Sequence, residues 1–377
     1  MKRREFIKLF GGAAVGWPIC PARAQQHKGP VRLGFFPIGS PSNAYDRSLV
    51  EAFQQGLRRV GLIEKQDIVL DVVWIGDDPD QAVSEELRHG AELLIPCGSS
   101  AAVAAKRQSS TIPIIFLNVG DPIAMGLVES LPRPGHNATG FSDILAQLSG
   151  KLVDLARELI KPQMTVDYLW HTAWPDGRNR YQATEQAVHA AGMQLQSKGI
   201  ADIAELDGAL AGIKQSGSTT LIVQPSPFTY RHRERIVASA MMNGLGTIFA
   251  FPVAAREGSL IAYGPDYNHM YSRAPFYVDR VLKGTKPADL PVEQSAKVEF
   301  LINLQTAKTL AVEVPLSLLI RADDLLDEAR YYLRHPIPYD ECRLSGVNRG
   351  HRQNFGFDPN RSLGLGHINV ILLSNVP

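Results

Sequence analysis

The stretch from Leu93 to Pro122 reads LLIPCGSSAAVAAKRQSSTIPIIFLNVGDP and decides the fold. Its first run, Leu93 to Cys97, is apolar and predicts a buried strand, whereas the Ala-rich run Ser99 to Ser109 predicts a helix. The apolar run Ile112 to Val119 predicts a second strand. A strand, a helix and a strand in this order form a right-handed crossover between parallel strands. The stretch therefore indicates an α/β protein.

The same alternation continues on both sides of this unit. Ahead of it, the patterns predict strands at Val31–Phe36 and Ile68–Ile75 and helices at Ser48–Val60 and Asp80–His89. After it, a helix at Ile144–Ile160 opens a second series, with strands at Val166–Trp170, Met193–Gln196, Thr219–Gln224 and Thr247–Phe251 and helices at Tyr181–Ala191, Leu206–Gln215 and Glu234–Met242. We expect an α/β fold of two doubly wound, Rossmann-like lobes, each with a mainly parallel sheet.

Composition and charge narrow the class of protein. The chain has 377 residues, of which 45% are hydrophobic and 20% charged, and this mixture excludes a disordered or fibrous protein. The formal net charge is +1, so the broad basic field that duplex DNA binding needs is absent, and we expect no nucleic-acid partner. The longest apolar run, Leu9 to Ile19, is shorter than the roughly 20 residues of a membrane-spanning helix.

Residues 1–24 have the three parts of an export signal. A basic start is followed by the short apolar run and by the small-residue pattern Ala22-Arg23-Ala24. Arg3-Arg4 also resembles the twin-arginine export motif. Cys20 is not expected to carry a lipid, because Ile19 before it is larger than that signal requires. We predict cleavage after Ala24 and a periplasmic location.

The chemistry-bearing residue types do not form a known catalytic motif. The chain contains no nucleophile elbow, phosphate loop, His-Glu-x-x-His pair or Cys-x-x-Cys pair, and its ten His are scattered. Cys97 and Cys342 are predicted to be free thiols. We expect no metal, no cofactor and no enzymatic activity. The best enzyme alternative is a Cys97 nucleophile with a lowered pKa and a His of the second half as its base.

Candidate ligand-binding residues follow the predicted strands, because ligands of open parallel sheets bind at the carboxyl ends of the strands. Ser99 can cap the helix after Cys97-Gly98, and the free N–H groups there can also hold a carboxylate; the two roles are compatible. Asp121 can start a turn or accept a hydrogen bond from a ligand ammonium. The remaining candidates are Phe36, Ser40, Ser100, Trp174, Asp176, Ser226 and Phe251. For the aromatic residues, stacking on a flat ligand and packing in the core both stay open.

From Pro30 to Asp327 the sequence resembles the ABC transporter substrate-binding protein family, in its tryptophan and tyrosine uptake branch. The stretches that carry the resemblance, in order, are Ala52–Leu57, Thr111–Phe116, Gly120–Pro122 with Gly126–Val128, Pro132–Gly140, Ala262–Pro265, Val281–Gln294 and Arg321–Leu326. The block Val281–Gln294 is the most specific of them. The sequence departs from the family's usual pattern at Cys97-Gly98-Ser99 and in the loop Trp170–Arg178, so the ligand is the least transferable property.

The resemblance implies a type I periplasmic binding protein whose chain crosses between two lobes three times, near Ser142, near Tyr263 and near Val292–Ala296. The first lobe would comprise residues 30–142 and 263–292, and the second residues 143–262 and 293–327. It implies a small solute, by resemblance an aromatic or other amino acid, held between the lobes and delivered by a monomer to an ABC permease in the inner membrane. A sensor component for a membrane receptor is the alternative. A repressor-like regulator would need a DNA-binding domain where the export signal lies.

Residues 328–377 lie beyond the usual end of the family. The segment contains turn-rich pieces such as Asn354–Asn360. Three interpretations stay open: a disordered extension, translated sequence that selection never shaped, and a docking tail. Leu363-Gly364-Leu365-Gly366 lacks the third glycine and the preceding strand of a dinucleotide-binding loop. We assign no chemistry to this segment.

Overall fold

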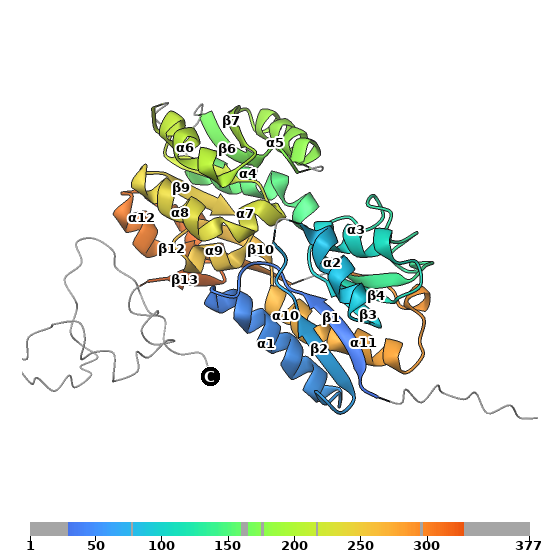
Figure 1. Ribbon diagram of the computed structural model, residues 1–377. Helices are drawn as coiled ribbons and strands as arrows, with labels where there is room; N and C mark the ends of the chain where they lie inside the picture. Colours follow the sequence, from blue (N-terminus) through green and yellow to red (C-terminus); the bar gives the residue numbers. More distant parts are fainter. Residues whose placement is uncertain are drawn as a thin grey trace, which may run out of the picture. The chain divides into compact units, whose positions relative to one another are not determined.

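The computed structural model describes residues 29–327, apart from residues 77, 160–164, 175–176, 216–217 and 295–296. The predicted export signal and the segment 328–377 lie outside the described residues. Within them, two sheets are each flanked by helices (Figure 1). In this part of the chain no helix combines the length and the apolar character that crossing a bilayer requires.

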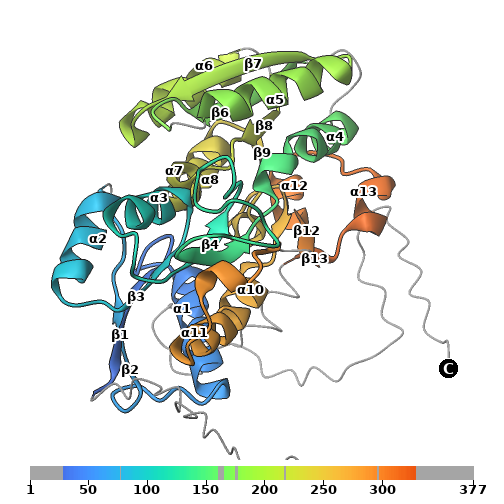
Figure 2. The same cartoon turned by 90° about the vertical axis from the view of Figure 1, so that its right-hand side faces the viewer.

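The first sheet is wholly parallel, with the strand order β11-β5-β4-β3-β1-β2. Its strands are β1 (Val31–Phe36), β2 (Ile68–Val72), β3 (Leu93–Pro96), β4 (Ile114–Val119), β5 (Ala138–Ser142) and β11 (Glu293–Gln294). Its helices are α1 (Ala44–Arg59), α2 (Pro79–Arg88), α3 (Ser99–Gln108), α10 (Tyr267–Arg273) and α11 (Pro275–Leu282), with a 3₁₀ turn at Pro287–Asp289. Figure 2 labels the strands β1 to β4 and the helices α1, α2, α3, α10 and α11 of this sheet.

Alternating side chains of this sheet enter two separate cores. Phe35 packs with Phe53 of α1 and Tyr271 of α10, whereas the next residue, Phe36, lies in a cluster with Leu94, Ala102 and other residues of α2 and α3. Successive residues of a strand point to opposite faces of the sheet. Helices therefore cover both faces, as the doubly wound prediction requires.

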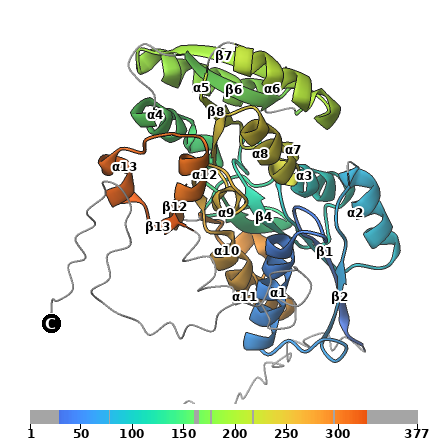
Figure 3. The same ribbon diagram turned by 90° about the vertical axis from the view of Figure 1, so that its left-hand side faces the viewer.

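The second sheet has the strand order β13-β12-β10-β9-β8-β6-β7 and is parallel except for the antiparallel pair β10 and β12. Its strands are β6 (Thr165–His171), β7 (Gln194–Ile200), β8 (Thr220–Val223), β9 (Gly246–Phe249), β10 (Ile261–Pro265), β12 (Val298–Asn303) and β13 (Asp324–Leu326). Its helices, visible in Figure 3, are α4 (Ser149–Leu159), α5 (Gly177–Ala190), α6 (Leu206–Gln215), α7 (Pro227–Arg231), α8 (Arg233–Met242), α9 (Pro252–Arg256), α12 (Leu304–Thr309) and α13 (Leu316–Arg321). Short 3₁₀ turns lie at Leu145–Gln147 and Ile203–Glu205.

The predicted α/β fold with two mainly parallel sheets is confirmed. Two residue boundaries between the sheets differ from the prediction. Tyr263 pairs with Phe300 in the second sheet, because β10 runs on to Pro265 before the chain returns to α10. Glu293 and Gln294 pair with β5 in the first sheet, because this short strand extends the sheet edge before the chain enters β12.

Candidate ligand-binding site

A cavity of about 230 Å³ lies where the carboxyl ends of strands from both sheets meet. The first sheet contributes the segments at the ends of β1, β2, β3, β4 and β5, and the second sheet those at the ends of β6, β8, β9 and β10. Pockets for drug-sized ligands are about 300–1,000 Å³. The volume of this cavity therefore fits a small solute.

Several residues predicted from the sequence line this cavity. They are Cys97, Gly98, Ser99, Ser100, Trp174, Ser226 and Phe251. The structure brings these residues together around one cavity. Their contact with a ligand stays a prediction. Asp176 lies outside the described residues.

Three other predicted residues do not line the cavity. Phe36 is fully buried in the core beneath α2 and α3, because its place on β1 points it to that face. Asp121 is exposed, and its Oδ1 accepts hydrogen bonds from the backbone N–H groups of Ile123 and Ala124, so it serves the turn rather than the cavity. Ser40 donates its backbone N–H to Asp46 and pairs its hydroxyl with Ser42.

The N-terminus of α3 opens onto the cavity. Gly98, not Ser99, is the N-cap residue; it has φ +91°, and no side chain caps the helix. Glycine has no side chain that could accept from the first-turn N–H groups, so these donors and the positive end of the helix dipole face the cavity lining. Ser99 and Ser100 are the first two helical residues. This end of α3 is suited to an anionic group.

Asn118 lines the cavity at the end of β4 and has φ +56°, in the left-handed region. It lies in an irregular part of the β4–β5 pairing, where the register shifts between Phe116 and Val119. Its side chain is buried beside the Tyr267 hydroxyl, yet neither amide atom makes a hydrogen bond of normal geometry within the described residues. Such buried polar atoms are rare and call for an explanation.

A carboxylate and a guanidinium both lie close to Gly120. A Cβ at Gly120 would come within 2.7 Å of Nη2 of Arg180 and 3.5 Å of Oδ1 of Asp143. Asp143 is almost fully buried, and burial raises its pKa to about 6, although a hydrogen bond from the Leu145 N–H and the charge of Arg180 act in the opposite direction. The Arg180 guanidinium lies 5.0 Å from the centre of the Trp174 ring.

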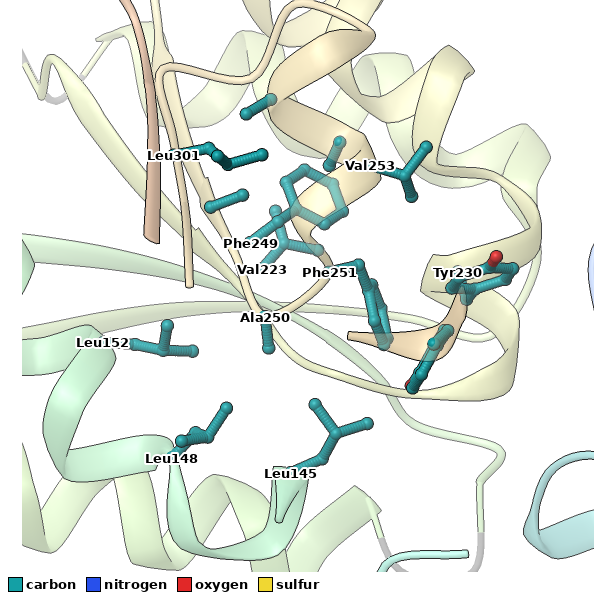
Figure 4. Packing of buried hydrophobic residues seen from close by; sticks show 14 of the residues in the cluster. Leu145, Leu148, Leu152, Val223, Tyr230, Phe249, Ala250, Phe251, Val253 and Leu301 are labelled. Atoms are coloured by element: carbon teal, nitrogen blue, oxygen red, sulfur yellow. The ribbon is translucent and has the colours of Figure 1, made fainter. Parts of the chain in front are cut away.

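Aromatic side chains of the second sheet form the apolar part of the lining. His171 stacks on Phe228 at a ring distance of 4.3 Å, and burial lowers the pKa of His171, which favours the neutral imidazole. Tyr230 contacts Phe251 edge to face at 4.9 Å. Figure 4 shows these two rings at the margin of the core formed by Phe249, Val253 and Leu301. These four residues, His171, Phe228, Tyr230 and Phe251, form an aromatic wall of the cavity, and the core packs behind it.

The sequence matches a known protein family over most of its length. A match to the family described as ABC transporter substrate binding protein covers residues 43–326. The chain belongs to this family. The resemblance noted in the sequence is confirmed, and the two-sheet architecture is that of the type I periplasmic binding proteins.

Individual relatives of this ABC transporter substrate-binding protein are distant. The chain is 26% identical to the tyrosine-binding protein of Clostridioides difficile over 223 residues, which are 59% of this chain and 64% of that protein, just under two thirds of its length. A domain from Streptococcus pneumoniae solved in complex with L-Trp has a TM-score of 0.70 at 21% identity, and covers 79% of this chain and 100% of its own. A ligand-free, open substrate-binding protein from Clostridium difficile has a TM-score of 0.57 at 20% identity, covering 79% of this chain and 99% of its own.

The substrate-binding protein's Cys97 does not have the properties of a nucleophile. Burial raises the pKa of its thiol well above the ordinary value, and the neighbouring Tyr271 hydroxyl offsets this only in part. The enzyme alternative requires a lowered pKa, because the thiolate is the reactive form. In the described part of the chain, no three His, Cys, Asp or Glu side chains are grouped to hold a metal ion. The family and the solved relatives are solute-binding proteins.

Sequence reasoning missed the polar residues at the centre of the site. Asn118, Asp143, Arg180 and Tyr267 line the cavity, and none was among the predicted residues. The predicted helix began at Tyr181, whereas α5 begins at Gly177 and therefore carries Arg180 in its first turn. The signal for Asn118 was its place directly after a buried apolar run, three residues ahead of Asp121.

Proposed function

We propose that this protein is the solute-binding component of an ABC importer. It captures a small solute between its two sheets and delivers it to a membrane permease. The solute is an amino acid, with a preference for an aromatic one. The observation that carries the proposal is the cavity, in which an uncapped helix end, buried charged groups and an aromatic wall converge from both sheets. Membership of the family supports the transport role. The names of two relatives, which mention tyrosine and L-Trp, support the ligand class.

The site would hold the two ends of such a solute differently. The first-turn N–H groups of α3, with Ser99 and Ser100, would bind the carboxylate. Trp174 and Phe251 would cover the apolar body of the ligand, with Ser226 beside them. Export by the predicted signal would place the protein in the periplasm, where a permease in the inner membrane can receive the solute.

Thermal unfolding of the purified protein against the twenty amino acids, several sugars and simple carboxylates tests this function. A ligand at 100 times its Kd stabilises the folded state by about 2.7 kcal/mol, which a melting scan detects. We expect the melting temperature to rise with one or a few amino acids, and Trp174→Ala to weaken their affinity at least 10-fold. A matched control is Trp170→Ala, because Trp170 packs on Tyr181 and does not line the cavity. A response to sugars alone would contradict the ligand class.

The transport role needs a separate measurement. Uptake of the radiolabelled solute by cells should fall when the gene for this protein is deleted and return when it is restored. Binding in vitro without any change in uptake would favour the sensor alternative.

A further inference from the structure

Asn118 has surroundings that a purely structural asparagine does not have. It is only 6% exposed and lines the cavity, and neither its Oδ1 nor its Nδ2 has a partner at normal hydrogen-bond geometry among the described residues, although the side chain contacts the Tyr267 hydroxyl. Asn137 in the same sheet region is the contrast. Its amide donates to the carbonyls of Ser109 and Ile112 and its Oδ1 accepts from Lys106. Leaving a buried polar group unpaired costs free energy, so an amide in this position calls for an explanation such as a partner that the ligand supplies.

The backbone holds Asn118 in this position at the expense of strain. The left-handed φ of +56° is uncommon for residues other than glycine, although asparagine tolerates it better than most. The neighbouring strand contributes Gly140, where a Cβ would collide with the Phe116 carbonyl, so β5 approaches β4 closely at the irregularity. Irregularities of this kind redirect a side chain and are common next to functional sites.

Two opposite charges lie beside Asn118 in the cavity lining. A Cβ built on Gly120, two residues further along, would lie 3.5 Å from the carboxylate of Asp143 and 2.7 Å from the guanidinium of Arg180, so both charged groups are near this one position. The carboxylate can only accept hydrogen bonds, and the guanidinium can only donate them, whereas an amide does both. The three side chains together offer acceptors for a cation and donors for an anion within one small cavity.

We propose that Asn118 is a specificity-determining residue that reads both charged groups of a zwitterionic α-amino acid. Its Oδ1 accepts from the ligand ammonium together with Asp143, and its Nδ2 donates to the ligand carboxylate together with Arg180 and the N-terminus of α3. This inference rests on the proposed function and sharpens it. It restricts the substrate class to free α-amino acids and excludes simple amines and simple carboxylic acids.

Calorimetry with matched probes tests the ligand side of this proposal. The probes are L-tryptophan, tryptamine, which lacks the carboxylate, and indole-3-propionate, which lacks the ammonium, with L-tyrosine, tyramine and 3-(4-hydroxyphenyl)propionate as a second set. We expect the wild type to bind an amino acid at least 100-fold more tightly than either of its analogues. Asn118→Asp, which keeps the shape and tolerates the left-handed backbone, should weaken amino-acid binding at least 10-fold and weaken amine binding much less. Equal affinity for an amino acid and its amine or acid would overturn the proposal.

The stability of the unliganded protein gives a readout that does not depend on knowing the ligand. Asn118→Gly relieves the left-handed strain and removes two buried polar atoms that lack hydrogen bonds of normal geometry, so its melting temperature should equal or exceed that of the wild type. Asn137→Gly, the matched control, loses paired hydrogen bonds and should melt several degrees lower. A melting temperature for Asn118→Gly that falls as far as that of Asn137→Gly would overturn the proposal by showing a structural role.

The two experiments separate this inference from the proposed function. If a solute without one of the charged groups binds tightly and Asn118→Asp leaves its affinity unchanged, the binding function stands and the inference fails. If no solute stabilises the wild type, the proposed function fails. The unliganded melting temperature of Asn118→Gly then still decides the role of Asn118, because a rise supports a residue held for binding and a fall refutes it.

Discussion

Asp143 shows how a single residue of the site couples stability to pH. Its folded-state pKa of about 6 lies above the ordinary 3.8, so the folded protein holds the proton more tightly than the unfolded chain does. The folded state is therefore destabilised progressively as pH rises from about 4 to about 6, and the full penalty applies above that range. The charged and titratable groups near this carboxyl include Arg180 and Tyr267.

Replacing Asp143 by Asn should remove that penalty. We expect the unliganded Asp143→Asn protein to be more stable than the wild type at pH 7.5 by about 1–3 kcal/mol, since each pH unit of difference corresponds to about 1.36 kcal/mol. At pH 4.5 the difference should shrink, because the wild-type carboxyl is protonated there. Urea unfolding at the two pH values measures it. An equal difference at both would show that ionisation of Asp143 is not its source.

Gly120 tests, at the same scale, whether the position of Arg180 matters for binding. A Cβ there would lie 2.7 Å from the Arg180 guanidinium, which must move away. We expect Gly120→Ala to lower solute affinity at least 10-fold and to change unfolding stability by less than about 1 kcal/mol, because the displaced group is the end of a flexible side chain. Gly76→Ala is the matched control, since Gly76 also lines the cavity but has open space around it. Equal titration curves for both variants would contradict the role of Arg180.

Between elements, the packing of α1 depends on a glycine. Gly56 is buried where α1 meets the α10–α11 region, and a Cβ there would lie 2.7 Å from Pro275 Cγ and 2.8 Å from the Ser272 carbonyl oxygen. Neither atom can give way without moving a helix, so Gly56→Ala should cost about 1–3 kcal/mol in urea unfolding. Gly208→Ala in α6, which has nothing within 4 Å, should instead raise stability by up to about 1 kcal/mol. Stability changes of opposite sign in the two variants would show that the contact at Gly56, rather than helix propensity, determines the effect of the substitution.

The elements also show which parts of the site a sequence can reveal. The strand, turn and helix at Leu93–Ser109 were predictable because the apolar run, Gly98 and the Ala-rich stretch are contiguous. Asn118 was not, because it lies where the pairing of β4 with β5 is irregular, next to the close approach of Gly140 to the Phe116 backbone. Asp121 was predicted to bind a ligand because a carboxylate can accept a hydrogen bond from an ammonium group. Its carboxylate instead accepts hydrogen bonds within the turn that it starts. Local sequence patterns therefore predict helices and strands, whereas the positions of the polar residues in the cavity depend on contacts between these elements.

On the scale of the whole described unit, a buried polar network joins the two sheets. Arg233 of α8 is 1% exposed and forms ion pairs with Asp46 of α1 at 3.0 Å and with Glu257 at 2.8 Å. The Tyr230 hydroxyl donates to Asp46 as well, at 2.8 Å. Asn43, the N-cap of α1, donates from Nδ2 to Glu234 at 2.7 Å and to Glu257 at 2.9 Å. These bonds hold α1 of the first sheet against α8 and the end of α9 of the second.

This network should favour the conformation in which the cavity is enclosed, and Asn43 offers a clean way to weaken it. Asn43→Ser keeps a good N-cap but loses both donor bonds, whereas Asn43→Asp keeps the cap and places a third carboxylate beside Glu234 and Glu257. We expect solute affinity to fall about 3-fold for the first variant and at least 10-fold for the second. Small-angle X-ray scattering should show a larger radius of gyration for unliganded Asn43→Asp than for the wild type, with a smaller change for Asn43→Ser. If both variants keep the wild-type radius and affinity, the network serves stability alone and closure is governed elsewhere.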